Sequence, residues 1–263
     1  MPPSATLLSV AAFDKALPLA IRDRCLFFGS IPITETASFP PAPTNECWIY
    51  LTLNAEIALS LPESWELSQL VQSRRARISI DGQWLWWALK RKYPGQRLHK
   101  LSGSDLIHVL AADCARDGGR LLLLGSSPAR NALAVQRFRH RWPTLEVAGY
   151  APECQGDESE REMHQEALEA IASFRPNYVV LGLGAAKEQR FAFQCAATLD
   201  GKVRGLLCFG GAIDMASGAV RRAPRIVQYI GLEGLYRVWQ QPARLGRLLR
   251  VLRVLPMLGR GAY

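Results

Sequence analysis

Apolar strands that alternate with amphipathic helices restrict the fold of this chain more than any other feature. The run 120–124 consists of Arg120 and four leucines, and such a run is typical of a parallel strand covered by helices on both faces. A turn at 125–128 leads from this run into a helical pattern over 129–141. The same order of strand, turn and helix recurs along the chain, without an internal repeat. We therefore predict an α/β fold with a Rossmann-like, doubly wound and mostly parallel sheet.

The hydrophobic patterns divide the chain into three predicted regions. These are an N-terminal extension (1–24), a Rossmann-like catalytic domain (25–220) and a basic amphipathic C-terminal appendage (221–263). Within the domain we predict strands at 25–33 (a pair), 48–53, 77–80, 120–124, 145–149, 178–183 and 205–209. Helices are predicted at 55–61, 65–75, 84–93, 104–116, 129–141, 158–174 and 187–199.

Positive charge is concentrated at the C-terminal end. The chain has a formal net charge of +9, and the segment from Arg221 to Tyr263 holds nine arginines and one acidic residue, Glu233, which gives that segment a net charge of +8. A local basic region favours an anionic partner, although a solvated helix face is the common alternative. Nucleic acid is a weaker alternative because the segment has no DNA- or RNA-binding motif.

The compartment is predicted from what the sequence does not contain. The six cysteines have no CxxC spacing, so we expect buried thiols in a reducing compartment. We find no signal peptide and no stretch of roughly 20 apolar residues that would span a bilayer. The histidines show no metal spacing, and we predict no bound metal. The protein is expected to be cytoplasmic, with at most peripheral contact with a membrane.

Polar or glycine-rich turns follow five of the predicted strands. They lie at 52–56, 81–82, 125–127, 182–189 and 210–214. Ligands of open α/β sheets bind outside the carboxyl ends of the strands, so these turns are expected to form a nucleotide pocket. The chain has no Walker loop, and Lys187 stands where a dinucleotide fingerprint would need its third glycine.

Asp81 is the best candidate for a general base, because a carboxylate at a strand end can take a proton from an attacking hydroxyl. The alternative is a helix cap or a turn aspartate, and Asp214 faces the same choice. Thr52 and Asn54 offer hydrogen bonds to sugar hydroxyls, with helix capping as their alternative.

Several motifs together resemble the WecG/TagA/CpsF family of glycosyltransferases, glycosyltransferase family 26. They occur in the family's order between about Gly29 and Leu255. The motifs are Thr52-Leu53-Asn54-Ala55-Glu56, Asp81-Gly82, Ser102-Gly103-Ser104-Asp105-Leu106, Leu124-Gly125 with Pro128, Gly182-Leu183-Gly184, Gly210-Gly211-Ala212-Ile213-Asp214, Gly218, Arg222-Ala223-Pro224, Gly231-Leu232-Glu233, Leu235-Tyr236-Arg237 and Gln241-Pro242-Ala243-Arg244.

The resemblance implies a bacterial, metal-independent and inverting hexosyltransferase of surface polysaccharide biosynthesis. It would move a sugar from a UDP-sugar to a sugar on a polyprenyl diphosphate, with no cofactor. Asp81 would be the base with Thr52 beside it, and the basic appendage would bind the diphosphate and an anionic membrane at the inner face of the plasma membrane. The substrate-binding residues would be Asn54, Gly125, Ser126, Gly184, Lys187, Glu188, Gln189, Gly210, Gly211, Asp214, Arg237, Arg244 and Arg247.

Three departures from the family pattern keep a second function open. Glu188 and Gln189 stand in exchanged order, Gly234 replaces a common tryptophan, and a proline-rich connector replaces a helix before Trp48. The alternative is a catalytically weak member that binds UDP-sugar or the lipid carrier as an assembly component. The sequence identifies neither the transferred sugar, with N-acetylmannosamine, its uronic acid and hexoses all open, nor the acceptor, and it leaves a homo-oligomer open.

Overall fold

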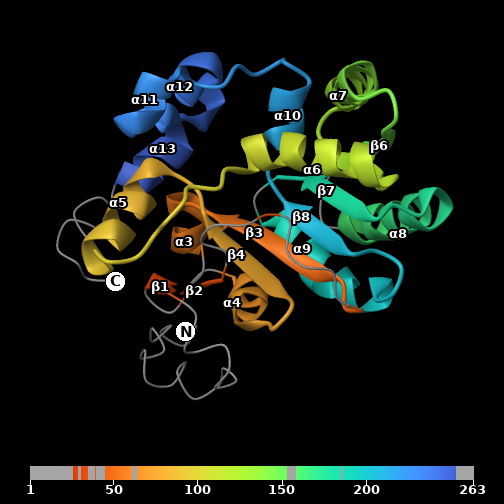
Figure 1. Cartoon of the computed structure of the whole chain (residues 1–263), viewed down its shortest axis with the longest axis horizontal. Helices are drawn as coiled ribbons and strands as arrows, with labels where there is room; N and C mark the ends of the chain where they lie inside the picture. The colour runs from red at the N-terminus through yellow and green to blue at the C-terminus, as the bar shows by residue number, and fades with distance from the viewer. Residues whose placement is uncertain are drawn as a thin grey trace. The chain divides into compact units, whose positions relative to one another are not determined.

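A computed structural model gives the arrangement of the chain, and it describes residues 26–28, 31–34, 39, 45–60, 64–152, 158–184 and 186–252. Six parallel strands form the main sheet in the order β4-β3-β8-β7-β5-β6 (Figure 1). The predicted Rossmann-like α/β fold is confirmed. The strands are β3 (Trp48–Leu53), β4 (Ala76–Ile80), β5 (Arg120–Gly125), β6 (Glu146–Tyr150), β7 (Tyr178–Gly182) and β8 (Gly205–Cys208).

The chain divides into two compact units, which are described separately. One unit contains residues 39–51 and 102–222. The other contains the segment 52–101, the segment that begins at Ala223, and a small antiparallel pair, β1 (Leu26–Phe28) and β2 (Ile31–Ile33). β3 is shared, because Leu51 belongs to the first of these units and Thr52 to the second.

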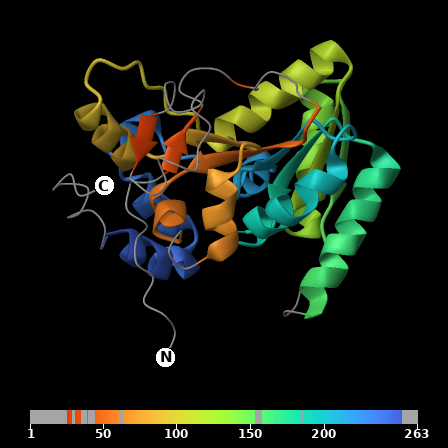
Figure 2. The ribbon, with the colours of Figure 1, turned by 90° about the horizontal axis from the view of Figure 1, so that it is seen from below.

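Helices cover both faces of the strands in the unit 39–51 and 102–222. They are α6 (Gly103–Asp117), α7 (Pro128–Arg141), α8 (Glu158–Phe174), α9 (Lys187–Cys195), the 3₁₀ turn η2 (Ala196–Leu199) and α10 (Ala212–Ala216). Figure 2 shows α6 and α8 on opposite sides of the strands. This agrees with right-handed crossovers, because the chain moves toward the β6 edge of the sheet through α6, which leads to β5, and away from that edge through α8, which leads from β6 to β7.

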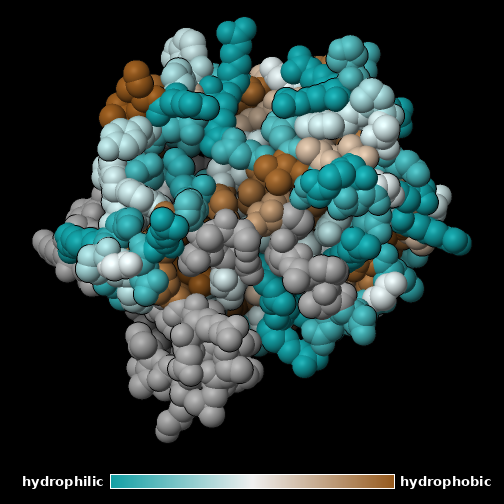
Figure 3. All heavy atoms as spheres, in the orientation of Figure 1, coloured by the Kyte–Doolittle hydropathy of each residue, from teal (hydrophilic) through white to brown (hydrophobic). Residues whose placement is uncertain are grey.

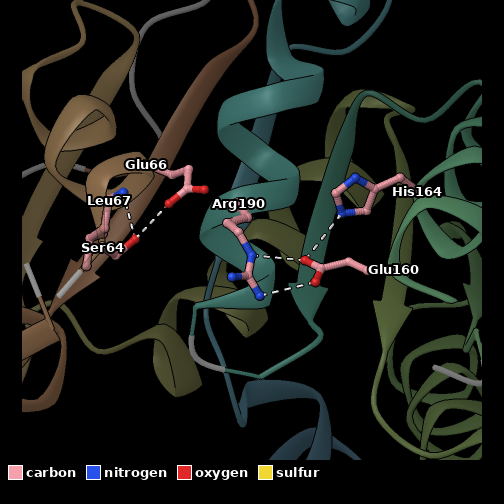
Figure 4. A network of polar contacts seen from close by, with 6 residues as sticks. All are labelled: Ser64, Glu66, Leu67, Glu160, His164 and Arg190. Carbon is pink, nitrogen blue, oxygen red and sulfur yellow. Dashed lines mark hydrogen bonds and ion pairs between the residues drawn. The ribbon is translucent and has the colours of Figure 1, made fainter. Parts of the chain in front are cut away.

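Ion pairs anchor α9, which carries three of the predicted site residues, Lys187, Glu188 and Gln189. Arg190 of α9 donates from Nε and Nη2 to the two carboxylate oxygens of Glu160 in α8, at 3.0 and 3.2 Å (Figure 4). His164 lies one turn further along α8, with Nε2 4.0 Å from Glu160 Oε1. Burial lowers the pKa of His164, so Arg190 is the main cationic partner of Glu160 near neutral pH.

The other unit carries α3 (Ala55–Ser60), α4 (Trp65–Gln72), α5 (Gln83–Lys92), α11 (Arg225–Tyr229), α12 (Glu233–Gln240), the 3₁₀ turn η3 (Pro242–Arg244) and α13 (Leu245–Leu252). Ser64 caps α4, since its Oγ accepts the Leu67 N–H at 3.2 Å and donates to Glu66 Oε2 (Figure 4). β2 is tied to β4 through Thr34, whose Oγ1 accepts the Ile78 N–H at 2.7 Å.

The predicted elements are present within the described residues, with a few shifted ends. Helix 187–199 is divided into α9 and η2, and the amphipathic tail is broken into α11, α12, η3 and α13. The breaks fall where helices end for local reasons, at Gly231 with φ +77° and at Pro242. The predicted extension 1–24 lies outside the described residues.

Four of the six cysteines lie within the described residues, namely Cys47, Cys114, Cys195 and Cys208, and all four are buried thiols outside any disulfide, as predicted. Burial raises the pKa of the Cys114 thiol to about 12 and that of Cys195 to about 11. Cys25 and Cys154 are outside the described residues. Among the helices that the structure describes, none combines the length and the apolar character needed to span a bilayer.

Candidate active site

A cavity of about 320 Å³ lies within the unit that contains 52–101 and the C-terminal helices. Two distant parts of the sequence form its wall, one at the ends of β3 and β4 and one in the segment 228–252. The lining residues are Asn54, Ala55, Glu56, Asp81, Gly82, Gln83, Trp84, Gln228, Gly231, Leu232, Glu233, Gly234, Leu235, Arg237, Val238, Arg244, Leu248, Val251 and Leu252. The predicted residues Asn54, Asp81, Arg237 and Arg244 are therefore brought together.

Asp81 is the first residue after β4, and two features fix the course of its backbone. Its N–H donates to the carbonyl of Leu53 at the end of β3, at 2.7 Å. The next residue, Gly82, has φ +91°, a conformation that other L-residues rarely adopt. This turn starts α5 directly after the aspartate and leaves the Asp81 carboxylate at the cavity wall.

Asn54 caps a helix and also lies at the cavity. Its Oδ1 accepts the Ile57 N–H at 3.0 Å, so the side chain caps the first turn of α3. It also lines the cavity beside Asp81. Thr52 lies in β3 with a side chain that is only 3% exposed, and it is not among the lining residues. A direct role of Thr52 in catalysis remains a prediction.

Arg237 and Arg244 bring positive charge to the cavity from α12 and η3. Arg237 Nη2 donates to Glu233 Oε1 at 3.0 Å, one helical turn earlier. The Nε of Arg237 is buried and has no hydrogen-bond partner in the described part of the chain. An unsatisfied buried guanidinium N–H favours an anionic ligand. The third predicted arginine, Arg247, lies in α13, and its side chain is outside what the structure describes.

Further residues of the cavity were not predicted as site residues, among them three in the first turns of two helices. Glu56, Gln83 and Trp84 line it from the first turns of α3 and α5. Their proximity to Asn54 and Asp81 along the chain was the available signal. Residues in the first turn of a helix that begins at a ligand-binding strand end often face the ligand.

A second group of predicted residues assembles at strand ends in the unit 39–51 and 102–222. Gly125 and Ser126 follow β5, and the Ser126 N–H donates to the carbonyl of Gly182 at the end of β7, at 2.9 Å. Ser126 has φ +63°, an uncommon conformation for a residue with a side chain. Asn131 of α7 stabilises this turn, because its Nδ2 donates to the carbonyls of Leu123 and Gly125 at 2.9 and 2.8 Å.

Asp214 is tied to this turn. Ser126 Oγ donates to Asp214 Oδ1 at 2.5 Å, and Nη1 of Arg130 lies 3.4 Å from Asp214 Oδ2. Asp214 lies in α10, which follows Gly210 and Gly211 after β8. The structure therefore gives Asp214 a structural role in joining two strand-end turns, alongside the predicted role in binding.

Glu188 and Gln189 lie in the first turn of α9, after Gly184 and Lys187, and each is only 2% exposed. Gln189 Nε2 donates to Glu188 Oε1 at 3.2 Å. Glu188 Oε1 lies close to Gly210, about 3.7 Å from the position that a Cβ would take there. Gln189 Oε1 is buried and unpartnered among the described residues, so its carbonyl oxygen is available to a ligand.

Comparison with protein families gives a match over most of the chain. Residues 41–260 match the family described as "Glycosyl transferase WecG/TagA/CpsF family". The chain belongs to this family. It is therefore a glycosyltransferase, with a role in polysaccharide biosynthesis.

The match to the glycosyltransferase family covers both groups of site residues. It includes the strand-end turns with Ser126 and Asp214 as well as the cavity with Asp81 and Arg237. Within the described residues, no group of three or more His, Cys, Asp or Glu side chains is arranged to hold a metal ion.

Asn131→Asp tests how strongly the strand-end turn of this glycosyltransferase depends on one buried amide. The substitution removes the two N–H donors and places a carboxylate against backbone carbonyls. We expect the free energy of unfolding to fall by about 2–4 kcal/mol in urea denaturation. The control is Thr144→Val, which removes an exposed bond from Oγ1 to the Ala115 carbonyl and should cost under about 1 kcal/mol. Equal losses in both variants would contradict the role of Asn131.

Proposed function

We propose that this glycosyltransferase moves a sugar from a UDP-sugar to a sugar carried on a polyprenyl diphosphate, with inversion at the anomeric carbon. The observation that supports it best is the cavity, whose lining residues include Asp81, Arg237 and Arg244. A general base and two cations in one cavity suit an acceptor that has both a nucleophilic hydroxyl and a diphosphate.

In the proposed reaction, the carboxylate of Asp81 takes the proton of the acceptor hydroxyl. The acceptor oxygen then attacks the anomeric carbon of the donor on the face opposite to UDP. A new glycosidic bond forms as the bond between the donor's anomeric carbon and the oxygen of UDP breaks, and UDP leaves with the electron pair. A single displacement of this kind inverts the anomeric configuration.

Three carboxylates line the cavity, and two observations favour Asp81 as the base. Glu233 forms an ion pair with Arg237, which commits it to holding that guanidinium in place. Glu56 lies in the first turn of the short helix α3, whereas Asp81 stands at the end of β4, where its N–H donates to the Leu53 carbonyl. A base must keep a defined position relative to the hydroxyl, so a strand-end residue is the better candidate.

Apolar side chains in the rest of the cavity wall are consistent with an acceptor that has a lipid part. Apart from Arg237 and Arg244, the C-terminal segment contributes mainly apolar side chains, among them Leu235, Leu248 and Leu252. We propose that they contact the first isoprene units, while the two arginines bind the diphosphate. A buried Arg237 Nε without a partner supports this assignment.

For the donor, we propose the strand-end turns of the other unit. Backbone N–H groups near Gly125, Gly184 and Gly210 would bind the diphosphate of UDP without a metal ion. The buried amide oxygen of Gln189 supports recognition of a hydrogen-bond donor on the nucleotide sugar. Lys187 and Gly211, which adjoin these turns, remain predicted donor contacts.

We also propose peripheral association with an anionic membrane at the inner face of the plasma membrane. Large apolar side chains of the C-terminal helices are exposed, with Ile226 at 76%, Tyr229 at 72% and Trp239 at 77%. Figure 3 shows hydrophobic surface at the upper left, in the region that α11 and α12 occupy in Figure 1. Exposed apolar side chains beside arginines are typical of helices that lie in a membrane interface.

Asp81→Asn tests the proposed base. The amide keeps the shape of the side chain but does not accept the acceptor proton, so we expect turnover to fall by about 10²–10⁴-fold. Transfer is measured with a panel of UDP-sugars and a short-chain polyprenyl-diphosphate sugar. The Kd for UDP is measured by calorimetry, and in the variant it should stay within about twofold of wild type.

Two controls accompany this assay. Asp117→Asn removes an exposed carboxylate that pairs with Arg116, and its turnover should equal that of wild type. Glu56→Gln examines the other unassigned carboxylate of the cavity. Wild-type turnover in Asp81→Asn would refute the base, whereas binding of UDP without turnover by the wild-type enzyme would favour the catalytically weak binding protein.

Membrane association is tested with the double substitution Ile226→Ser/Trp239→Ser. Removing two exposed apolar side chains should lower the partition coefficient onto phosphatidylglycerol-containing vesicles by at least about tenfold. The matched control is Trp65→Ser, because Trp65 is 67% exposed but lies in α4. Cosedimentation with vesicles measures the binding. Unchanged partitioning of the double variant, or an equal loss in Trp65→Ser, would contradict the assignment.

A further inference from the structure

Trp84 joins the two parts of the sequence that form the Asp81 cavity. It lies in the first turn of α5, three residues after Asp81, and lines the cavity. Its indole Nε1–H donates to the backbone carbonyl of Gly231 at 2.9 Å. Gly231 belongs to the turn between α11 and α12, so one hydrogen bond connects the strand-end helix to the C-terminal segment.

The turn at Gly231 is shaped to receive this indole. Gly231 has φ +77°, and a Cβ built on it would lie 3.0 Å from Trp84 Nε1 and 3.1 Å from Cε2. A side chain at this position would therefore push the backbone away from the ring. On the other side, Trp87 packs edge-on against Trp84, with ring centroids 5.1 Å apart and planes at 90°.

The contact between Trp84 and Gly231 lies just before the helix that carries Arg237, one of the cations of the cavity. The Gly231 N–H donates to the Gln228 carbonyl, and the Leu232 N–H donates to Val227, so the end of α11 closes on itself. α12 begins two residues later, at Glu233, and carries Arg237 in its second turn. A displacement of the turn would therefore displace Arg237 relative to Asp81.

We propose that Trp84 is a positioning residue. Its hydrogen bond to Gly231, called the latch below, holds the α11–α12 turn against α5 and so sets the position of Arg237 in the cavity. This inference rests on the proposed function for its kinetic consequence, but the latch itself is a property of the fold. Trp84 is 37% exposed, and its indole N–H connects the two segments.

Trp86 provides a matched control on the same helix. Its Nε1–H also donates to a backbone carbonyl at 2.9 Å, that of Leu98, and Trp86 does not line the cavity. Trp84→Phe and Trp86→Phe thus remove the same kind of bond from the same helix. Gly231→Ala is a third variant, which keeps the indole but displaces its acceptor.

The first measurement is amide hydrogen exchange, which needs neither donor nor acceptor. Trp84→Phe and Gly231→Ala should speed exchange in residues 225–240 by about five- to tenfold, the effect of losing one hydrogen bond. Trp86→Phe should leave exchange in this segment at the wild-type rate. Wild-type exchange in both latch variants, or an equal increase in Trp86→Phe, would overturn the latch.

The second measurement is transfer kinetics with the short-chain polyprenyl-diphosphate sugar. A latch that positions Arg237 predicts a KM for the acceptor about five- to tenfold higher in Trp84→Phe and Gly231→Ala, with the KM for the donor within about twofold. Altered exchange with an unchanged acceptor KM would overturn the positioning role. Absence of transfer in the wild-type enzyme would refute the proposed function, while the exchange experiment still decides the latch.

Discussion

The candidate active site depends on how β4 ends. The Asp81 N–H is bound by the carbonyl of Leu53, and the positive φ of Gly82 turns the chain at once into α5. These two constraints place a carboxylate at the end of a buried strand and a helix directly behind it. Two further contacts hold the wall of the cavity: Asn54 caps α3, and Trp84 donates to the Gly231 carbonyl in the C-terminal turn.

The fold was predictable because its signals are local. Strands such as β5 and β7 are continuous apolar runs, and the helices between them have a clear period, so the α/β alternation can be read from short windows. The tail was less predictable. Its amphipathic pattern continues across Gly231 and Pro242, where the backbone breaks it into separate helices.

The site was predictable in part, for a related reason. Asp81, Asn54 and the glycine turns stand at strand ends, a position that a sequence can indicate. The contact of Trp84 with Gly231 depends instead on residues far apart in the chain, and no local pattern reveals which carbonyl an indole N–H will reach. The same holds for Ser126 and Asp214, whose hydrogen bond gives a predicted binding residue a structural role.

The proposed function depends on the Asp81 cavity binding the acceptor. Photolabelling tests it most directly, using a short-chain polyprenyl-diphosphate sugar that carries a diazirine on its first isoprene unit, followed by peptide mapping. If the acceptor binds in this cavity, labels should appear in residues 231–252 or 81–84, and unlabelled acceptor should compete them away. Competed labels found only in residues 125–127 or 210–214 would contradict it, because the acceptor would then bind at the turns assigned to the donor.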